Sequence, residues 1–208
     1  MKHQWQYWRL ITPFFLSVCF QQFVFNSCAL VLLGFILEAT GIGFAKMATI
    51  FIGSGIGGAF FGAICSSDLA VGADIAYFGF VSALLAAAIV NWKALESIGM
   101  MRLCLIMMIV MLFVILLLYT SANNQVSIQG YPIFLYYDLY AHFGSFITGL
   151  LLGLMLMRRA RRIGLVQESS FEKLCFKIGA GGLLFFFGLL IILWCTAVKP
   201  VPNFFLKT

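Results

Sequence analysis

The segment Phe44–Cys65 reads FAKMATIFIGSGIGGAFFGAIC, and its character determines what kind of structure the chain can form. Lys46 is its only charged residue, and as a helix the stretch can cross the roughly 30 Å hydrocarbon core of a bilayer. Two GxxxG pairs are formed by Gly53, Gly57, Gly58 and Gly62. Because this spacing lets helix backbones approach closely in lipid, we predict a membrane span that packs tightly on a neighbour.

The chain as a whole is also strongly apolar. Of its 208 residues, 63% are hydrophobic and 10% are charged, whereas soluble domains carry about a quarter charged residues. The mean hydropathy is +1.06. Backbone polar groups find no partners in lipid, so spans are helices or closed barrels, and the alternation of a barrel strand is missing. We therefore predict an all-α, polytopic transmembrane helix bundle with about six spans.

The predicted spans cover about 16–37, 44–65, 71–92, 100–120, 139–157 and 176–198. The segment 123–138 is too polar to span and is expected to be a loop at the membrane surface. Phe185, Phe186 and Phe187 are expected to face lipid rather than a partner subunit, because phenylalanine is tolerated well in hydrocarbon.

The net charge of +6 comes largely from Arg158, Arg159, Arg161 and Arg162, which follow the fifth predicted span. This cluster is typical of a topology anchor on the cytosolic or matrix side of a membrane. Nucleic-acid binding is not expected, since no basic face with interleaved aromatic residues is present. With six spans, nine basic residues lie on one side and four on the side of both termini. The termini are therefore predicted to face away from the cytosol or matrix.

The six cysteines form no CxxC pair, and most lie inside apolar runs. They predict neither a disulfide framework nor a zinc site. No phosphate-binding loop, haem motif or iron–sulfur spacing is present, so no cofactor and no metal are expected. The partner that the sequence itself demands is the lipid bilayer.

Four groups of residues resemble a known family. Trp8 and Arg9 form a Trp-Arg pair, and the following span carries Asn26 and ends at Glu38. The third predicted span opens with the sequence AVGADIAYFG, in which Asp74 is the polar residue. The fifth opens with YAHFGS, which contains His142 and begins a ladder of small residues at Ser145, Gly149 and Gly153.

In this order and at these spacings, the four groups resemble the rhomboid family of intramembrane serine proteases, over about 8–159. The resemblance places Asp74 at the position of the serine nucleophile and His142 at that of the general base. Gln22 stands where the family has a histidine that assists the oxyanion site, while Asn26 is retained. The small-residue ladder matches the one that brings the family's histidine helix against its nucleophile helix.

The resemblance also implies differences in architecture. We expect a rhomboid-like membrane core over 1–159 that lacks the family's first helix. Residues 160–208 are expected to form a basic loop and an additional C-terminal transmembrane helix.

The nucleophile chemistry is altered in several places. An Asp74 carboxylate is a poor acyl nucleophile, because its attack on an amide would give an unstable anhydride. Ile75 adds bulk where the family has glycine. The chain is therefore not expected to be an enzyme. Asp74 and His142 begin spans on the same side, so the pair ties two helices together, holds a ligand, proton or metal, or is exposed to solvent; we favour the first.

Two aspartates near predicted spans also invite comparison with a second enzyme class. Presenilin-like aspartyl proteases place two aspartates on adjacent spans, in Tyr-Asp and Gly-x-Gly-Asp motifs. Tyr137 and Asp138 match the first motif, but Ala73 replaces the second glycine before Asp74, and the chain order is reversed. We reject this interpretation.

The function that the sequence favours is that of a non-catalytic rhomboid-like accessory subunit of a larger membrane protein complex, bound to other membrane subunits. A pseudoprotease that binds transmembrane clients or assists protein translocation or quality control is the first alternative, and a protease with residual activity is the second. We favour the mitochondrial inner membrane over the endoplasmic reticulum or a bacterial inner membrane.

Overall fold

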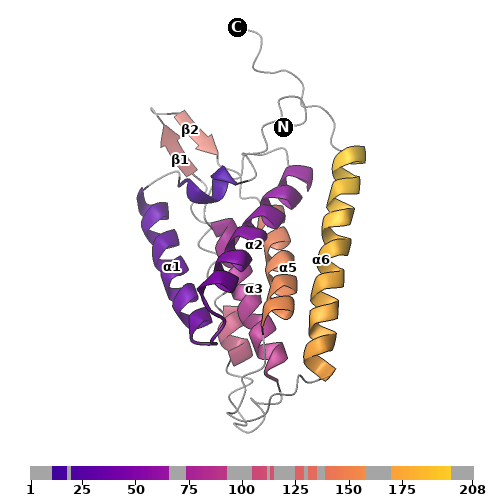
Figure 1. The fold of residues 1–208 in the computed structure, drawn as a ribbon. Helices are drawn as coiled ribbons and strands as arrows, with labels where there is room; N and C mark the ends of the chain where they lie inside the picture. Colours follow the sequence, from indigo (N-terminus) through magenta and orange to yellow (C-terminus); the bar gives the residue numbers. More distant parts are fainter. Residues whose placement is uncertain are drawn as a thin grey trace.

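Long helices dominate the structure, a computed structural model that describes residues 11–17, 20–65, 74–92, 105–111, 113–114, 125–128, 131–134, 139–157 and 170–197. In chain order the elements are η2 (Thr12–Phe15), α1 (Phe20–Glu38), α2 (Phe44–Cys65), α3 (Asp74–Val90), β1 (Gln125–Ile128), β2 (Tyr131–Phe134), α5 (Leu139–Leu156) and α6 (Ser170–Ala197). Helical residues at 105–111 and 113–114 fall within the predicted fourth span. The helices lie side by side as a bundle (Figure 1), which confirms the predicted all-α membrane architecture.

Helices α2, α5 and α6 are long and apolar enough to cross a membrane. Helices α1 and α3 contain shorter apolar segments, Gln22–Glu38 and Asp74–Val90. All five fall on predicted spans. The bounds of α2 are those expected from the sequence, whereas α6 begins at Ser170, ahead of the predicted start near 176. The chain is a multi-pass integral membrane protein.

A short turn joins α1 to α2, and two glycines make it possible. Gly41 and Gly43 have φ angles of 74° and 82°, in the left-handed region that side chains with a Cβ rarely adopt. The amide of Gly41 donates to the carbonyl of Glu38 at 2.8 Å, and the hydroxyl of Thr40 donates to the carbonyl of Leu37 at 2.6 Å. These bonds satisfy carbonyls that the end of α1 leaves without intrahelical partners.

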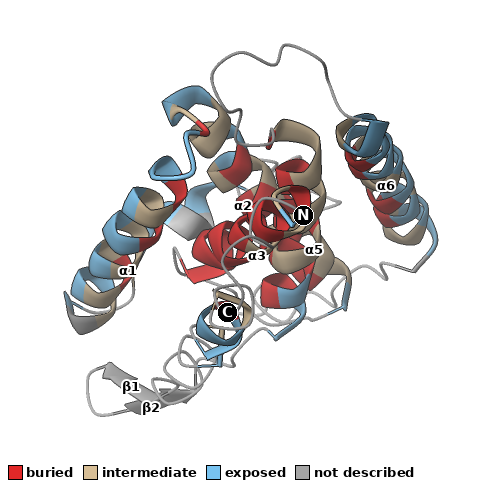
Figure 2. Ribbon diagram, turned by 90° about the horizontal axis from the view of Figure 1, so that it is seen from below, coloured by how far each residue is buried: buried red, intermediate tan, exposed pale blue. Residues whose placement is uncertain are grey.

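Helix α3 is the centre of the bundle. All of its residues are buried except Leu85 and Ile89, which are half-buried. Figure 2 shows buried residues concentrated on α2, α3 and α5, with α1 and α6 flanking them and exposing their outer faces. Since a bilayer surrounds these outer faces, their exposed apolar side chains are suited to contact with lipid.

Glycines let α5 lie close to both α2 and α3. A methyl group added to Gly149 would lie 2.5 Å from both the Cα and the carbonyl oxygen of Gly79 on α3. A methyl group at Gly153 would lie 2.6 Å from Cβ of Ala86, also on α3. On the neighbouring face of α5, Gly57 of α2 packs against the side chain of Thr148. The GxxxG pairs and the small-residue ladder therefore meet in one three-helix contact.

The segment 123–138, which was expected to be a loop, contains two β-strands. Strands β1 and β2 form an antiparallel pair with Gln125 opposite Phe134 and Ile128 opposite Tyr131. The two residues between the strands are Gln129 and Gly130. A two-residue connection with glycine favours a hairpin, and the β-branched and aromatic residues beside it suit strands.

The three consecutive phenylalanines on α6 do not share one environment. Phe185 is exposed, as expected for a side chain that faces lipid, but Phe186 is buried and stacks on Phe61 of α2 with ring centroids 6.0 Å apart. Phe187 is half-buried and contacts Phe186 edge to face. A helix turns by about 100° per residue, so three successive side chains cannot all face the same surroundings.

Several residues singled out from the sequence lie outside the described part of the chain. They are Trp8, Arg9, Gly72, Ala73, Tyr137, Asp138, Arg158, Arg159, Arg161 and Arg162.

Candidate functional site

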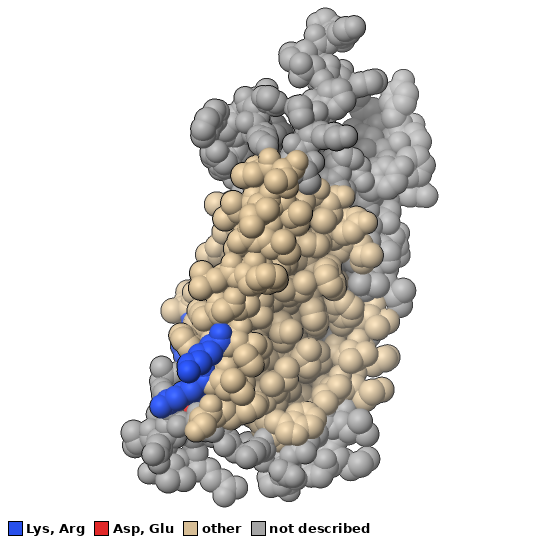
Figure 3. Space-filling view, turned by 90° about the vertical axis from the view of Figure 1, so that its right-hand side faces the viewer, with Lys and Arg blue, Asp and Glu red and all other residues tan. Residues whose placement is uncertain are grey.

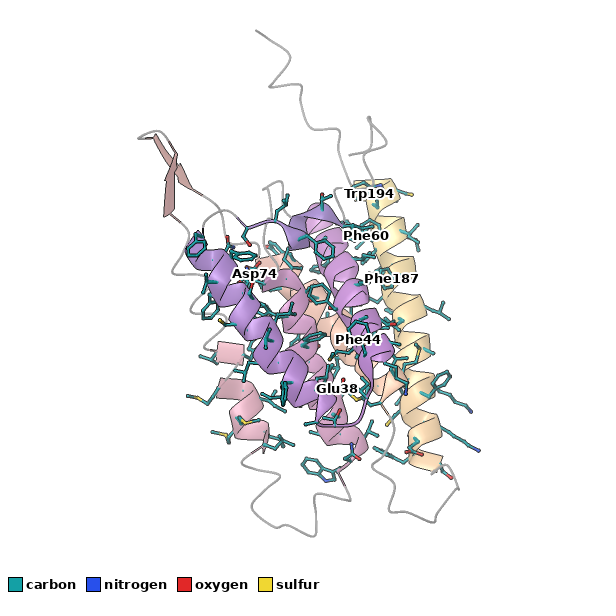
Figure 4. All side chains as sticks on the ribbon, turned by 60° about the vertical axis from the view of Figure 1, so that its left-hand side comes forward. Glu38, Phe44, Phe60, Asp74, Phe187 and Trp194 are labelled. Carbon is teal, nitrogen blue, oxygen red and sulfur yellow. The ribbon has the colours of Figure 1, made fainter. Side chains whose placement is uncertain are left out.

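Asp74 and His142 are in direct contact. Asp74 is the first residue of α3, and His142 lies in the first turn of α5. Nε2 of His142 and Oδ2 of Asp74 form a hydrogen bond of 3.2 Å, and both residues are buried, with exposed fractions of 4% for His142 and 8% for Asp74. A carboxylate at the start of a helix is stabilised by the amide groups of the first turn. Figure 4 shows Asp74 near one end of the bundle.

Phe78 fixes the orientation of the histidine ring. It lies one turn beyond Asp74 on the same face of α3, and its ring meets that of His142 edge to face, with centroids 4.5 Å apart. The ring of Phe113 also contacts Phe78 edge to face, with ring centroids 5.4 Å apart. The imidazole is therefore held between a carboxylate and an aromatic ring, which leaves it little rotational freedom. Phe78 was not predicted as a site residue, although its i, i+4 spacing from Asp74 indicates that it lies on the same helix face.

Ile75 is accommodated by a close approach of α2. A methyl group at Gly58 would lie 2.7 Å from Cγ2 of Ile75 and 2.5 Å from the carbonyl oxygen of Ala141. Ile75 is itself 1% exposed. The Ile75 side chain is thus packed against α2, and the absence of a side chain at Gly58 gives it room.

Gln22 and Asn26 lie one turn apart on α1, the helix that flanks α3. Gln22 is half-buried, and Asn26 is 2% exposed. Neither the amide nitrogen nor the amide oxygen of Asn26 has a hydrogen-bond partner among the described residues. Buried amides are rarely left in this state, so this position is suited to a water molecule or another polar group.

Ser145 follows His142 by one turn on α5, where its hydroxyl is fully buried and has no hydrogen-bond partner in the described part of the chain. Neighbouring hydroxyls bond to backbone carbonyls instead: Ser82 to Gly79 at 2.9 Å and Thr148 to Gly144 at 2.8 Å. The Ser145 hydroxyl therefore differs from these neighbours, because it makes no hydrogen bond to the backbone of the described helices.

Glu38 lies at the opposite end of the bundle from Asp74 (Figure 4). It is the last residue of α1, its side chain is exposed, and it borders an apolar groove between α1 and α2. The structure therefore brings Asp74, His142 and Ser145 together and places Glu38 in a separate region.

The chemistry available at the pair is limited. Oδ1 of Asp74 has no hydrogen-bond partner among the described residues, so this oxygen can accept one further bond. No group of three or more His, Cys, Asp or Glu residues that would hold a metal ion occurs in the described segments. The pair can hold or exchange a proton and can bind a hydrogen-bond donor, but it lacks a hydroxyl or thiol nucleophile at the Asp74 position.

These features define a polytopic helical membrane protein with a buried polar site where two of its spans begin. The family comparison narrows this class: residues 4–159 match the Rhomboid domain. The chain belongs to the rhomboid family, and α6 lies beyond the matched segment.

Curated relatives from Arabidopsis thaliana agree with this assignment. The chain is 31% identical to RHOMBOID-like protein 7 over 156 residues, and this aligned region covers 74% of this chain and 44% of the relative. It is 30% identical to RHOMBOID-like protein 5, over 73% of this chain and 45% of the relative. It is 29% identical to RHOMBOID-like protein 6, mitochondrial, over 72% of this chain and 44% of the relative. The chain spans less than half the length of these relatives, and no solved structure matches it significantly.

Proposed function

We propose that this chain is a non-catalytic rhomboid-like protein that serves as an accessory subunit of a larger membrane protein complex. The observation that carries the first half of the proposal is the Asp74–His142 contact. A carboxylate at the nucleophile position, 3.2 Å from the imidazole, cannot become the alkoxide that acylation requires. The pair instead joins the start of α3 to the start of α5.

The surroundings of the pair support a structural role. The Phe78 ring and the Asp74 carboxylate hold His142 from two sides, and Ile75 fills the space beside Gly58. A general base must reach the proton that it removes, and here its Nε2 atom is engaged by the carboxylate. The site is therefore suited to fixing helix positions.

The outer surface supports the second half of the proposal. An apolar groove of about 460 Å³ lies between α1 and α2, lined by Leu30, Val31, Gly34, Phe35, Phe44 and Met47, with Glu38 at its end. An exposed carboxylate at a membrane boundary complements a basic side chain. The partner that fits is a transmembrane helix of another subunit with Lys or Arg near the same boundary.

We place this subunit in the mitochondrial inner membrane, with both termini away from the matrix. Support comes from the name of one relative, RHOMBOID-like protein 6, mitochondrial. The basic residues of the sequence are consistent with this orientation, since they are more numerous on the opposite side.

Labelling with a fluorophosphonate serine-hydrolase probe tests the absence of catalysis. The wild-type chain in detergent is expected to remain unlabelled, while an active rhomboid protease run in parallel is labelled. Asp74→Ser is also expected to remain unlabelled, because Ile75 and Gln22 are still altered. Labelling of the wild-type chain would refute the non-catalytic assignment.

Stoichiometry tests the subunit assignment. A fixed subunit is expected to co-purify with its partners at a constant ratio through detergent extraction and size-exclusion chromatography. Photo-crosslinkers at Val31 or Phe35 are expected to give one discrete adduct, whereas Leu184 on the outer face of α6 serves as the matched exposed control. Substoichiometric recovery with many different adducts would instead support the pseudoprotease that binds transmembrane clients.

A further inference from the structure

All three basic residues in the described part of the chain line a single pocket. Lys46 lies at the start of α2, and Lys173 and Lys177 lie near the start of α6. The pocket has a volume of about 540 Å³ and is completed by the end of α5. Figure 3 shows the blue side chains gathered at one end of the face that α6 covers, with surface free of charged side chains (tan) above them.

The geometry leaves these ammonium groups available to a ligand. Nζ of Lys46 donates one hydrogen bond, at 3.2 Å, to the carbonyl oxygen of Leu156 near the end of α5. An ammonium group has three donors, so two have no partner within the described segments. Lys173 and Lys177 are exposed and lie one turn apart on the same face of α6. The bond to Leu156 holds the ammonium group of Lys46 at the end of α5, where Lys46 lines the pocket together with Lys173 and Lys177.

The charge of the pocket favours an anion. Among the described lining residues, the three lysines and Glu172 give a formal charge of +2. Glu172 lies in the first turn of α6, where a carboxylate also interacts favourably with the helix amide groups. A phosphodiester with a single negative charge leaves the pocket with a remaining positive charge, so binding needs no second cation.

Apolar side chains lie on the membrane side of these charges. Met155 and Phe176 line the pocket, and α6 continues with exposed Ile178 and Phe185 toward the middle of the bundle. A ligand with a negatively charged head and apolar chains matches a basic surface that is followed by an apolar one. The hydrocarbon stems of the lysines can lie along the helices while their charged ends remain at the headgroup level.

We propose that this pocket is a binding site for the phosphodiester headgroup of an anionic phospholipid, with the acyl chains lying along α5 and α6. Basic pockets between membrane helices commonly bind anionic lipid headgroups. A rule of topology alone requires positive charge near this boundary, but it does not require three lysines from two helices to converge on one pocket. Two of the three lysines lie on α6, beyond the matched family domain.

Native mass spectrometry of the full chain provides the test. Micelles contain equal amounts of phosphatidylglycerol and phosphatidylcholine, and the ratio of the two retained lipids is measured. Wild-type protein is expected to retain phosphatidylglycerol preferentially. The double variant Lys173→Gln/Lys177→Gln is expected to reduce this preference by about fivefold for each lysine removed, while Glu172→Gln is expected to increase it.

A matched control removes the same charge elsewhere. Lys199→Gln/Lys207→Gln changes two lysines outside the described residues and is expected to keep the preference. Equal losses in both double variants, or no preference in the wild-type chain, would overturn the proposal. If the double variant fails to fold, as judged by circular dichroism and size exclusion, Lys177→Gln alone replaces it.

A competition experiment identifies the source of the phosphate. Soluble glycerol phosphate is expected not to displace phosphatidylglycerol at millimolar concentration, because it lacks acyl chains to pack on the apolar lining of the pocket at Met155 and Phe176. Complete displacement would assign the pocket to a soluble phosphate and overturn the lipid assignment. The result does not depend on whether the chain is catalytic or part of a complex.

Discussion

The hydrogen bond between Nε2 of His142 and Oδ2 of Asp74, 3.2 Å long, joins the first turn of α5 to the first residue of α3. Both side chains lie inside the bundle. A buried pair of this kind is sensitive to the loss of either partner, because the group that remains is left in a medium of low polarity without its hydrogen bond. The pair is thus a contact whose removal can be measured as stability, independently of any activity.

Asp74→Ala is expected to lower the free energy of unfolding by about 1–2 kcal/mol, the upper range for hydrogen bonds between membrane helices. Asp74→Asn is expected to lose less, because its amide oxygen still accepts a bond from the imidazole. Unfolding by dodecyl sulfate in mixed micelles gives the measurement. A double-mutant cycle with His142→Ala provides the control, and strictly additive effects would show that the two side chains do not stabilise each other.

The contact of α2 with α3 and α5 is expected to depend on Gly58. In Gly58→Ala the added methyl group would meet the carbonyl oxygen of Ala141 at 2.5 Å, and a backbone atom cannot rotate away. We expect a loss of roughly 1–3 kcal/mol, measured by the same unfolding assay. Gly188→Ala on α6 is the matched control, since nothing lies within 4 Å of its added methyl group. Similar effects at both glycines would contradict the close packing at Gly58.

The sequence was sufficient to place Asp74 and His142 at one end of the bundle, because two spans that begin on the same side carry their first residues to the same depth. It was also sufficient to identify the small residues that allow close helix contact. For the second span it did not show the partner helix, since GxxxG spacing is the same for any partner; only the resemblance implied that the ladder of the fifth span meets the third. The room that Gly58 provides for Ile75 therefore depends on the three-dimensional packing of α2.

Two further features depend on contacts between distant segments. The hairpin of β1 and β2 falls in a polar segment where only the short Gln129–Gly130 connection indicated a turn. The pocket of Lys46, Lys173 and Lys177 requires α6 to lie beside the start of α2 and the end of α5. No local pattern in the sequence fixes that arrangement.

The aromatic support of His142 gives a third prediction. Phe78→Ala removes a fully buried ring that contacts the imidazole, with ring centroids 4.5 Å apart, and also contacts Phe113. We expect a loss of roughly 3 kcal/mol in the free energy of unfolding, within the range for removing a large side chain from a packed core. Phe185→Ala is the matched control, because its ring is 74% exposed and is not part of the packed core. An equal loss for the two variants would mean that Phe78 does not support the site.

The turn between α1 and α2 gives the last prediction, and it isolates backbone conformation from packing. Nothing lies within 4 Å of a methyl group added at Gly41, so Gly41→Ala creates no collision. Its φ of 74° nevertheless disfavours any residue with a Cβ, and we expect a loss of about 1 kcal/mol in stability. Gly41→Asn is expected to lose less, because asparagine tolerates the left-handed region. Gly181→Ala serves as the control at an equally open position of regular helix, where alanine is expected to stabilise by up to about 1 kcal/mol. If alanine had the same effect at both positions, the positive φ of Gly41 would not be what determines this turn.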